Sequence, residues 1–175
     1  MTDDLRYPIG RFTRNGSLSD ADRQSRIDDL AALPSRLTLA VDGLTDVQLD
    51  TPYRDEGWTV RQVVHHLADS HANAYMRMKL ALTEPSPVIR AYDERAWAGL
   101  ADSQAAPVIL SLDLIDALHC RWTWWLRTLA PADFTRPLVH PESGETTVEG
   151  LLELYAWHGR HHLAHITNVT ARNGW

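Results

Sequence analysis

Four segments of this chain repeat apolar residues at spacings of three and four, and this helical period constrains the fold more than any other feature. The segments span about residues 19–44, 59–84, 107–130 and 146–173. In the first, Ile27, Leu30, Leu33 and Leu37 fall on one helix face. Alternating strand patterns are nearly absent. We therefore expect an all-α protein in which four long amphipathic helices form a four-helix bundle.

Local signals mark where these helices begin and where they are interrupted. Three pairs have the spacing of an N-cap and its partner three residues on: Ser19 with Asp22, Thr59 with Gln62, and Thr146 with Glu149. Pro34 predicts a kink or a break in the first helix. Residues 84–106 predict a long link with one short helical turn near residues 93–100. Residues 136–146 predict a loop or small hairpin that turns at Gly144.

The length of 175 residues predicts one domain, residues 1–175, in which residues 1–18 form an extended N-terminal arm. The net charge is −6 and no basic cluster is present, which argues against nucleic acid as a partner. No apolar run reaches the roughly 20 residues of a membrane span. The first residues lack the pattern of a signal peptide, and Cys120 is the single cysteine. These features predict a cytoplasmic protein that does not enter membranes.

Histidines are concentrated in the last helical segment. The chain has nine, and four of them, His158, His161, His162 and His165, fall within eight positions. Imidazoles four residues apart on a helix can converge on one ion, and both the 158/162 and the 161/165 pairs meet this condition. The alternative is a set of core histidines that hydrogen-bond to one another and to the backbone. Four histidines on an inward-facing side favour a metal site.

A third ligand would come from the second segment, which contains His65, His66 and His71. The apolar stripe of this segment consists of Val60, Val63, Val64, Leu67, Ala74 and Met78. His71 lies near the centre of that stripe, whereas His65 and His66 lie on its opposite flanks. Periodicity alone therefore favours His71 as the third ligand.

Three stretches carry a resemblance to a known family: YPIG, LDTPYRDEGWTVRQVVHHLADSHAN and LYAWHGRHHLAHI. Together with the linker sequence RAYDERAW, they resemble the YfiT-type branch of the DinB-like superfamily from Tyr7 to Trp175. The resemblance implies a four-helix bundle in up-down-down-up order, a homodimer, and a metal-dependent hydrolase. Relatives in the superfamily include S-transferases that use bacillithiol or mycothiol.

The resemblance also implies which histidines bind the metal. The family's first ligand precedes a Leu-Ala-Asp step, which here selects His66 rather than His71. The other two lie four apart on the last helix, the first of them after an aromatic residue, which selects His158, after Trp157, and His162. Three histidines leave coordination positions open, as in catalytic zinc sites. We expect one divalent ion per chain, zinc in the cell, with nickel also acceptable to imidazole ligands.

Other residues and functions stay open at this point. Asp69 is a candidate to orient a ligand or act as a general base, or else forms a surface ion pair. His71 and His165 either support the ligands or are hydrogen-bonded core histidines, and Cys120 is expected to be a small core residue. Three functions are compatible with the site: a hydrolase of a small-molecule substrate, an S-transferase using a low-molecular-weight thiol, and a non-catalytic metal-binding stress-response protein.

Overall fold

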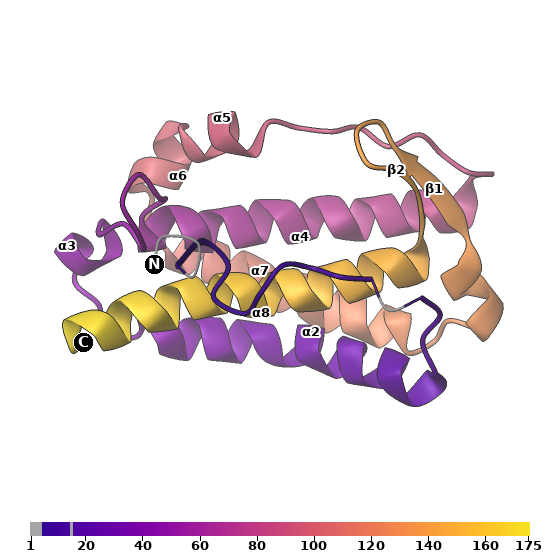
Figure 1. The fold of residues 1–175 in the computed structure, drawn as a ribbon, viewed down its shortest axis with the longest axis horizontal. Helices are drawn as coiled ribbons and strands as arrows, with labels where there is room; N and C mark the ends of the chain where they lie inside the picture. Colours follow the sequence, from indigo (N-terminus) through magenta and orange to yellow (C-terminus); the bar gives the residue numbers. More distant parts are fainter. Residues whose placement is uncertain (1–4, 15) are drawn as a thin grey trace.

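The computed structural model describes residues 5–14 and 16–175. Its four long helices are α2 (Asp20–Val41), α4 (Val60–Thr83), α7 (Ile109–Leu126) and α8 (Val148–Asn173). α2 packs against α7 and α8, and α4 packs against the same two helices. α2 and α8 run in one direction along the bundle, and α4 and α7 in the other (Figure 1). The expected four-helix bundle in up-down-down-up order is therefore confirmed.

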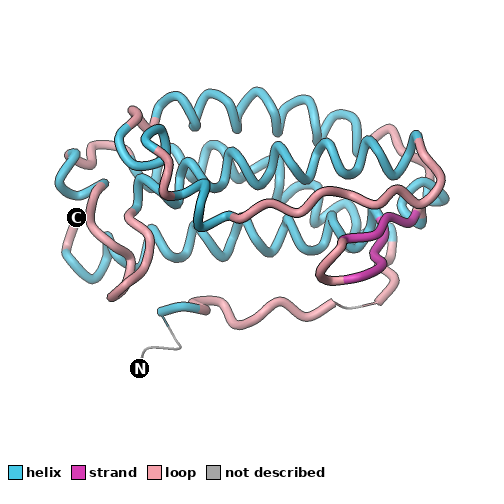
Figure 2. Tube along the Cα trace, turned by 90° about the horizontal axis from the view of Figure 1, so that it is seen from above, coloured by secondary structure: helices cyan, strands magenta, loops and turns pink. Residues whose placement is uncertain are grey.

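The parallel pair α4 and α7 requires a connection that returns along the whole bundle. Residues 84–106 provide it, and they run beside α4 (Figure 2). The link contains two short helices, α5 (Glu94–Ala98) and α6 (Ala101–Ala105), where one helical turn was expected. A further short helix, α3 (Asp46–Leu49), lies between α2 and α4. The link thus closes one long side of the bundle above α4.

The helix starts follow the capping signals with one exception. Ser19 caps α2, and Thr59 forms a complete capping box with Gln62 at the start of α4. The expected cap Thr146 is wrong by one residue, because Thr147 accepts the hydrogen bond of the Gly150 amide and α8 begins at Val148. Thr146 instead belongs to the hairpin of β1 (Pro137–His140) and β2 (Gly144–Thr147), in which it pairs with Leu138. The expected hairpin is confirmed, and Gly144 has a left-handed φ of 82°.

Pro34 does not interrupt the first helix. α2 is continuous from Asp20 to Val41, so the break that Pro34 suggested does not occur. The flanking Leu33 and Leu37 are both buried in the core. Tertiary packing of this apolar face therefore outweighs the loss of one backbone hydrogen bond at the proline.

The N-terminal arm lies along α8 rather than away from the bundle (Figure 1). Leu5 and Arg6 are helical, so the arm is not extended throughout its described length. The Phe12 ring packs 5.7 Å from the Trp157 ring, and the Arg14 guanidinium donates to the Thr147 hydroxyl at 3.2 Å. A 3₁₀ helix, η1 (Pro131–Thr135), follows α7 and leads into the hairpin. The arm therefore covers one flank of α8 where the histidines are concentrated.

The core consists of two apolar clusters at opposite ends of the bundle. The first apolar cluster, next to the hairpin, includes Trp122, Leu126, Leu138, Leu152 and Tyr155. The second apolar cluster, at the other end, includes Leu37, Val63, Leu67, Ile115 and Ile166. Each long helix contributes to both clusters. The candidate functional site lies between the two apolar clusters.

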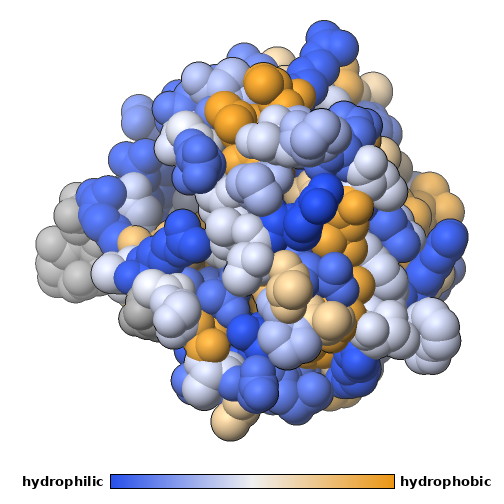
Figure 3. Space-filling view, turned by 90° about the vertical axis from the view of Figure 1, so that its right-hand side faces the viewer, coloured by the Kyte–Doolittle hydropathy of each residue, from blue (hydrophilic) through white to orange (hydrophobic). Residues whose placement is uncertain are grey.

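The outer surface mixes hydrophilic and apolar residues. The end of the bundle near the hairpin is largely hydrophilic, with smaller apolar patches between the charged groups (Figure 3). α7 exposes Leu110, Leu114 and Trp124. Among the residues described, no helix is long and apolar enough to cross a membrane. The homodimer stays a prediction.

Candidate metal centre

A layer of histidines separates the two apolar clusters, and three of the four long helices supply its side chains. On α4, His71 lies between the cluster residues Leu67 and Ala74. On α7, His119 lies between Ile115 and Trp122. The histidine layer consists of His66, His71, His119, His158, His162 and His165, and all of them except the half-buried His158 are buried. The core is therefore interrupted by a polar cross-section at mid-bundle.

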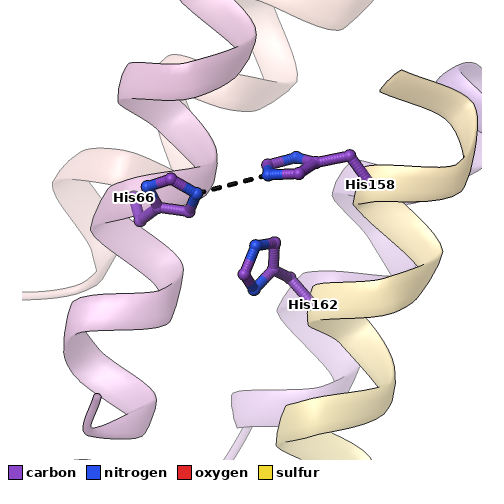
Figure 4. A group of neighbouring side chains, drawn as sticks. All are labelled: His66, His158 and His162. Carbon is purple, nitrogen blue, oxygen red and sulfur yellow. Dashed lines mark hydrogen bonds between the residues drawn. The ribbon is translucent and has the colours of Figure 1, made fainter. Parts of the chain in front are cut away.

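Three members of this layer converge across the gap between α4 and α8 (Figure 4). His66 projects from α4, and His158 and His162 project from successive turns of α8. One ring nitrogen from each lies within 4.8 Å of the others, and the Nε2 atoms of His66 and His158 are 3.3 Å apart. Two imidazole nitrogens on one tetrahedral zinc ion are separated by about 3.4 Å, as follows from Zn–N bonds of ~2.1 Å. The spacing of the three rings suits a single divalent ion.

The protonation of the three rings also suits a metal. Burial lowers the pKa of His66 to about 4. Burial, reinforced by the neighbouring histidines, holds the pKa values of His158 and His162 well below their ordinary range. All three imidazoles are therefore neutral at pH 7, and the neutral ring is the form that binds a metal ion.

His71, which the apolar stripe favoured as the third ligand, has no ring nitrogen left for an ion. Its Nδ1 lies 2.9 Å from His119 Nε2, and its Nε2 lies 3.2 Å from His158 Nδ1. The centre of the stripe faces the bundle axis, where His71 is fully buried. His66 lies on the flank of the stripe, and that flank borders a cavity.

The remaining histidines near the site make other contacts. His65 faces α6 and α7, with Nδ1 2.7 Å from the Ser111 hydroxyl and Nε2 3.1 Å from the Ala106 carbonyl. His161 stacks on Trp157 at 4.5 Å between ring centres. His165 stacks on Tyr53 at 3.9 Å, and its Nδ1 lies 3.3 Å from His162 Nδ1. The His161 and His165 rings lie 4.3 Å apart between centres, but the group of three whose ligand atoms converge among the described residues is His66, His158 and His162.

Two candidates from the sequence lie away from the three histidines. The Asp69 carboxyl is partly buried toward α6, and its pKa is raised by that burial and by the nearby Asp102. Asp69 is not among the described residues that line the cavity, so the structure does not place it as a base there. Cys120 is exposed on α7, and the expectation of a small core residue is wrong. His119 and Trp122 are buried on the inner face of α7, so Cys120, which lies between them in the sequence, is on the outer face of the helix.

The three histidines form part of the wall of a cavity of about 580 Å³. Trp58 packs beside them, with its ring centre 4.7 Å from that of His66. Phe12 and Arg14 of the N-terminal arm line one side, and the hairpin, including His140, lines another. A cavity of this size accepts a small organic molecule. The arm, the link and the hairpin therefore enclose a space that opens onto the ring nitrogens.

The cavity wall also holds a buried cation that the sequence reading missed. Arg77 is 8% exposed, and its Nη2 donates to the Arg90 carbonyl at 2.9 Å. Among the described residues, no carboxylate lies within ion-pairing distance of its guanidinium. Nearby, burial raises the pKa of Tyr92 to about 12. His66, Ser70 and Arg77 have spacings of four and seven along α4, which place them on one helix face, and this polar stripe was the available signal.

Comparisons with known proteins identify the family of this chain. The sequence model of the DinB superfamily matches residues 29–166. A Bacillus subtilis (strain 168) protein named "Putative metal-dependent hydrolase YfiT" is 53% identical over 172 residues, covering 98% of this chain and 97% of the relative. A Bacillus mycoides (strain KBAB4) protein, also named as a putative metal-dependent hydrolase, is 52% identical over 98% of this chain and 99% of its own length.

Solved structures give the same result. The structure of Bacillus subtilis YfiT, described as having an unusual four-helix bundle topology, superposes with a TM-score of 0.96 at 52% identity, covering 98% of this chain and 99% of that one. The four-helix bundle protein TT2238 shares the fold alone, with a TM-score of 0.55 at 20% identity, covering 87% of this chain and 99% of that one. The chain therefore belongs to the DinB superfamily, as a member of YfiT type.

Proposed function

We propose that this protein is a metal-dependent hydrolase of a small-molecule substrate, with one divalent ion per chain held by His66, His158 and His162. The convergence of three neutral imidazoles on one wall of a 580 Å³ cavity supports this proposal. Three protein ligands leave coordination positions for water and substrate, which is the pattern of catalytic zinc sites. Zinc is the ion we propose for the cell. When bound, such an ion lowers the pKa of a coordinated water to about 7 and polarises the bond to be cleaved.

The surrounding residues would bind and orient the substrate. Trp58 packs against His66 and against His162, whose ring centre is 6.4 Å away, and shields this side of the ligands from water. Arg77, with no carboxylate partner among the described residues, suits an anionic group of the substrate. Because Arg77 lies eleven residues after His66 on α4, about 16 Å along the helix axis, the substrate would extend along α4.

Metal binding is tested by substitution of the ligands. The wild-type protein should bind about one zinc ion per chain. His66→Ala, His158→Ala and His162→Ala should each weaken zinc binding by more than about 100-fold, which exceeds the effect of losing a ligand's hydrogen-bond partner. His65→Gln is the matched control, because the His65 ring nitrogens contact Ser111 and Ala106, away from the cavity. A wild-type protein that takes up no zinc contradicts the proposal.

The reaction is tested separately from the metal. Zinc-loaded protein should hydrolyse members of a panel of small anionic esters and amides in the absence of added thiol. Turnover that requires a low-molecular-weight thiol and an electrophile would instead identify an S-transferase. That thiol would come from solution, because Cys120 lies on the outside of α7. Stable zinc binding without turnover in either assay would support a non-catalytic metal-binding protein.

A further inference from the structure

The hydrogen bonds within the histidine layer have a direction, and two backbone carbonyls set it. A neutral imidazole has one N–H donor and one acceptor nitrogen, whereas a carbonyl oxygen only accepts. His119 Nδ1 lies 2.6 Å from the Leu30 carbonyl oxygen on α2. This nitrogen must therefore carry the proton and donate to Leu30. His119 Nε2 is consequently the acceptor nitrogen of the ring, provided that the ring is neutral.

This assignment propagates from His119 to the metal site. His71 Nδ1, 2.9 Å from His119 Nε2, must be the donor of that pair. His71 Nε2 is then an acceptor, so His158 Nδ1, 3.2 Å away, donates to it. His71 and His119 are 0% and 1% exposed, and a buried charge is costly unless it is paired, so both rings are neutral. The chain of donors leaves His158 with an unprotonated Nε2.

A second chain reaches the other ligand of α8 from the opposite side. His165 Nε2 lies 3.1 Å from the carbonyl oxygen of Arg6 in the N-terminal arm, so Nε2 donates. His165 Nδ1 is then the acceptor, and His162 Nδ1, 3.3 Å away, donates to it. His162 is left with an unprotonated Nε2. Two independent chains, each ending on a backbone carbonyl, thus impose the same tautomer on two proposed ligands.

The contact between His66 and His158 agrees with this assignment. Their Nε2 atoms are 3.3 Å apart (Figure 4), so one of the two must donate and the other accept. Because the chain from Leu30 makes His158 Nε2 the acceptor, His66 Nε2 is the donor. His66 is therefore the one ligand of the three that must move its proton, from Nε2 to Nδ1, before that nitrogen can bind an ion.

We propose that His119, His71 and His165 are positioning residues that form two histidine relays. One relay runs from Leu30 through His119 and His71 to His158, and the other runs from Arg6 through His165 to His162. Together they hold both ligands as Nδ1–H tautomers with Nε2 free for the ion. Hydrogen bonding to the second nitrogen of a metal-ligating histidine fixes its tautomer and ring orientation. This inference rests on the proposed metal site. It adds that the buried histidines His71, His119 and His165, from α4, α7 and α8, prepare the site before metal arrives.

The tautomers are measured directly in the metal-free wild-type protein by ¹⁵N–¹H NMR of the imidazole rings. His119, His71, His158 and His162 should be protonated on Nδ1, and His66 and His165 on Nε2. An Nε2–H tautomer at His158 or His162, or a mixture of the two forms, would overturn the proposal.

Paired variants test whether the relays act on the metal. His119→Gln and His165→Asn each keep a side-chain oxygen close to the acceptor position, whereas His119→Met and His165→Leu remove it. The Met and Leu variants should bind zinc about 10–100-fold more weakly and change the absorption spectrum of the cobalt-substituted protein, and the Gln and Asn variants should restore both. Met and Leu variants with wild-type zinc affinity would contradict the relays.

The outcomes separate this inference from the proposed function. A wild-type protein that binds no zinc would refute the metal site, while the NMR tautomers would still decide the relays. If the wild-type protein binds zinc and the Met and Leu variants bind it equally well, the proposed function would stand and the relays would be refuted. If either variant fails to fold, as judged by circular dichroism, the wild-type tautomers decide the proposal.

Discussion

The apolar clusters and the histidine layer are equally buried but are held together by different interactions. Trp122, in the first apolar cluster, and His71, in the layer, are both fully buried. Trp122 is surrounded by apolar side chains and aromatic rings, whereas both nitrogens of His71 are hydrogen-bonded to other histidines. A buried polar group without a partner costs roughly 1–3 kcal/mol, so the layer is tolerated only as a connected network. The comparison indicates that the clusters supply stability, whereas the layer supplies the ring nitrogens that we propose bind a metal ion.

The largest effect should come from the first apolar cluster. Trp122→Ala removes the largest fully buried side chain and leaves a cavity beside Met78 and Tyr155. The free energy of unfolding should fall by about 3–5 kcal/mol, as measured by urea denaturation. Zinc affinity, measured below the unfolding transition, should fall by less than in His119→Met, because Trp122 touches His71 and His119 only through edge-to-face ring contacts and holds none of their nitrogens. A large loss of zinc affinity with intact helicity would show that the cluster and the layer are not separable.

The opposite pattern, loss of zinc binding without loss of stability, is expected for a substitution of the proposed ligand His66. His66→Ala should abolish tight zinc binding, as described above, yet leave the metal-free protein close to wild-type stability. The reason is that the layer's other hydrogen bonds run from Leu30 and Arg6 and do not pass through His66. An unfolded His66→Ala protein would indicate that the layer, like the clusters, supports the fold.

Acid should destabilise the layer before the clusters. The pKa values of His66 and His119 are lowered by burial from an ordinary 6.5 to about 4, and burial also holds that of His71 well below 6.5. Between pH 6.5 and 4 the unfolded chain therefore binds more protons than the folded one. The free energy of unfolding is therefore unaffected by these histidines above pH 6.5, where they are neutral in both states, and it decreases as the pH falls below 6.5. The slope is about 1.4 kcal/mol per pH unit for each proton taken up on unfolding.

The measurement is the unfolding free energy of the metal-free protein from pH 7.5 to 4.5. His119→Gln is the informative variant, because it removes one buried titrating ring while keeping a polar side chain at that position. Below pH 6.5, this variant should reduce the slope of unfolding free energy against pH by the amount expected for about one proton. A wild-type stability that does not change over this range would mean that the layer takes up protons without unfolding.

The clusters were predictable from the sequence, whereas the layer was only partly so. Period and capping located all four long helices, because burial of an apolar face is a local, repeating pattern. The same pattern favoured His71 over His66, because it reports distance from the bundle axis and not access to a cavity. The resemblance to a family selected His66, and the ring nitrogens of His66, His158 and His162 do lie together. Arg77 and His119 were missed, because their neighbours come from segments distant in sequence.

The smallest effect should come from the cap of α8, which bounds the first apolar cluster far from the layer. The Thr147 hydroxyl accepts from the Gly150 amide at 3.1 Å and from Arg14 at 3.2 Å. Thr147→Ala should cost about 1 kcal/mol of unfolding free energy, because it leaves helix-terminal amides without a partner. For a chain of this length this corresponds to a fall in Tm of roughly 2–4 °C.

Thr146→Ala is the matched control for the cap. Thr146 lies in β2 opposite Leu138, and its hydroxyl does not cap α8, so its loss should lower Tm by less than the loss of Thr147. Zinc affinity should be unchanged in both variants, because His158 lies eleven residues along α8 from Thr147, about three helical turns away. A larger fall in Tm for Thr146→Ala than for Thr147→Ala would indicate that Thr146 caps α8, as the sequence predicted. A loss of zinc affinity in Thr147→Ala would show that fraying at the cluster end reaches the histidine layer.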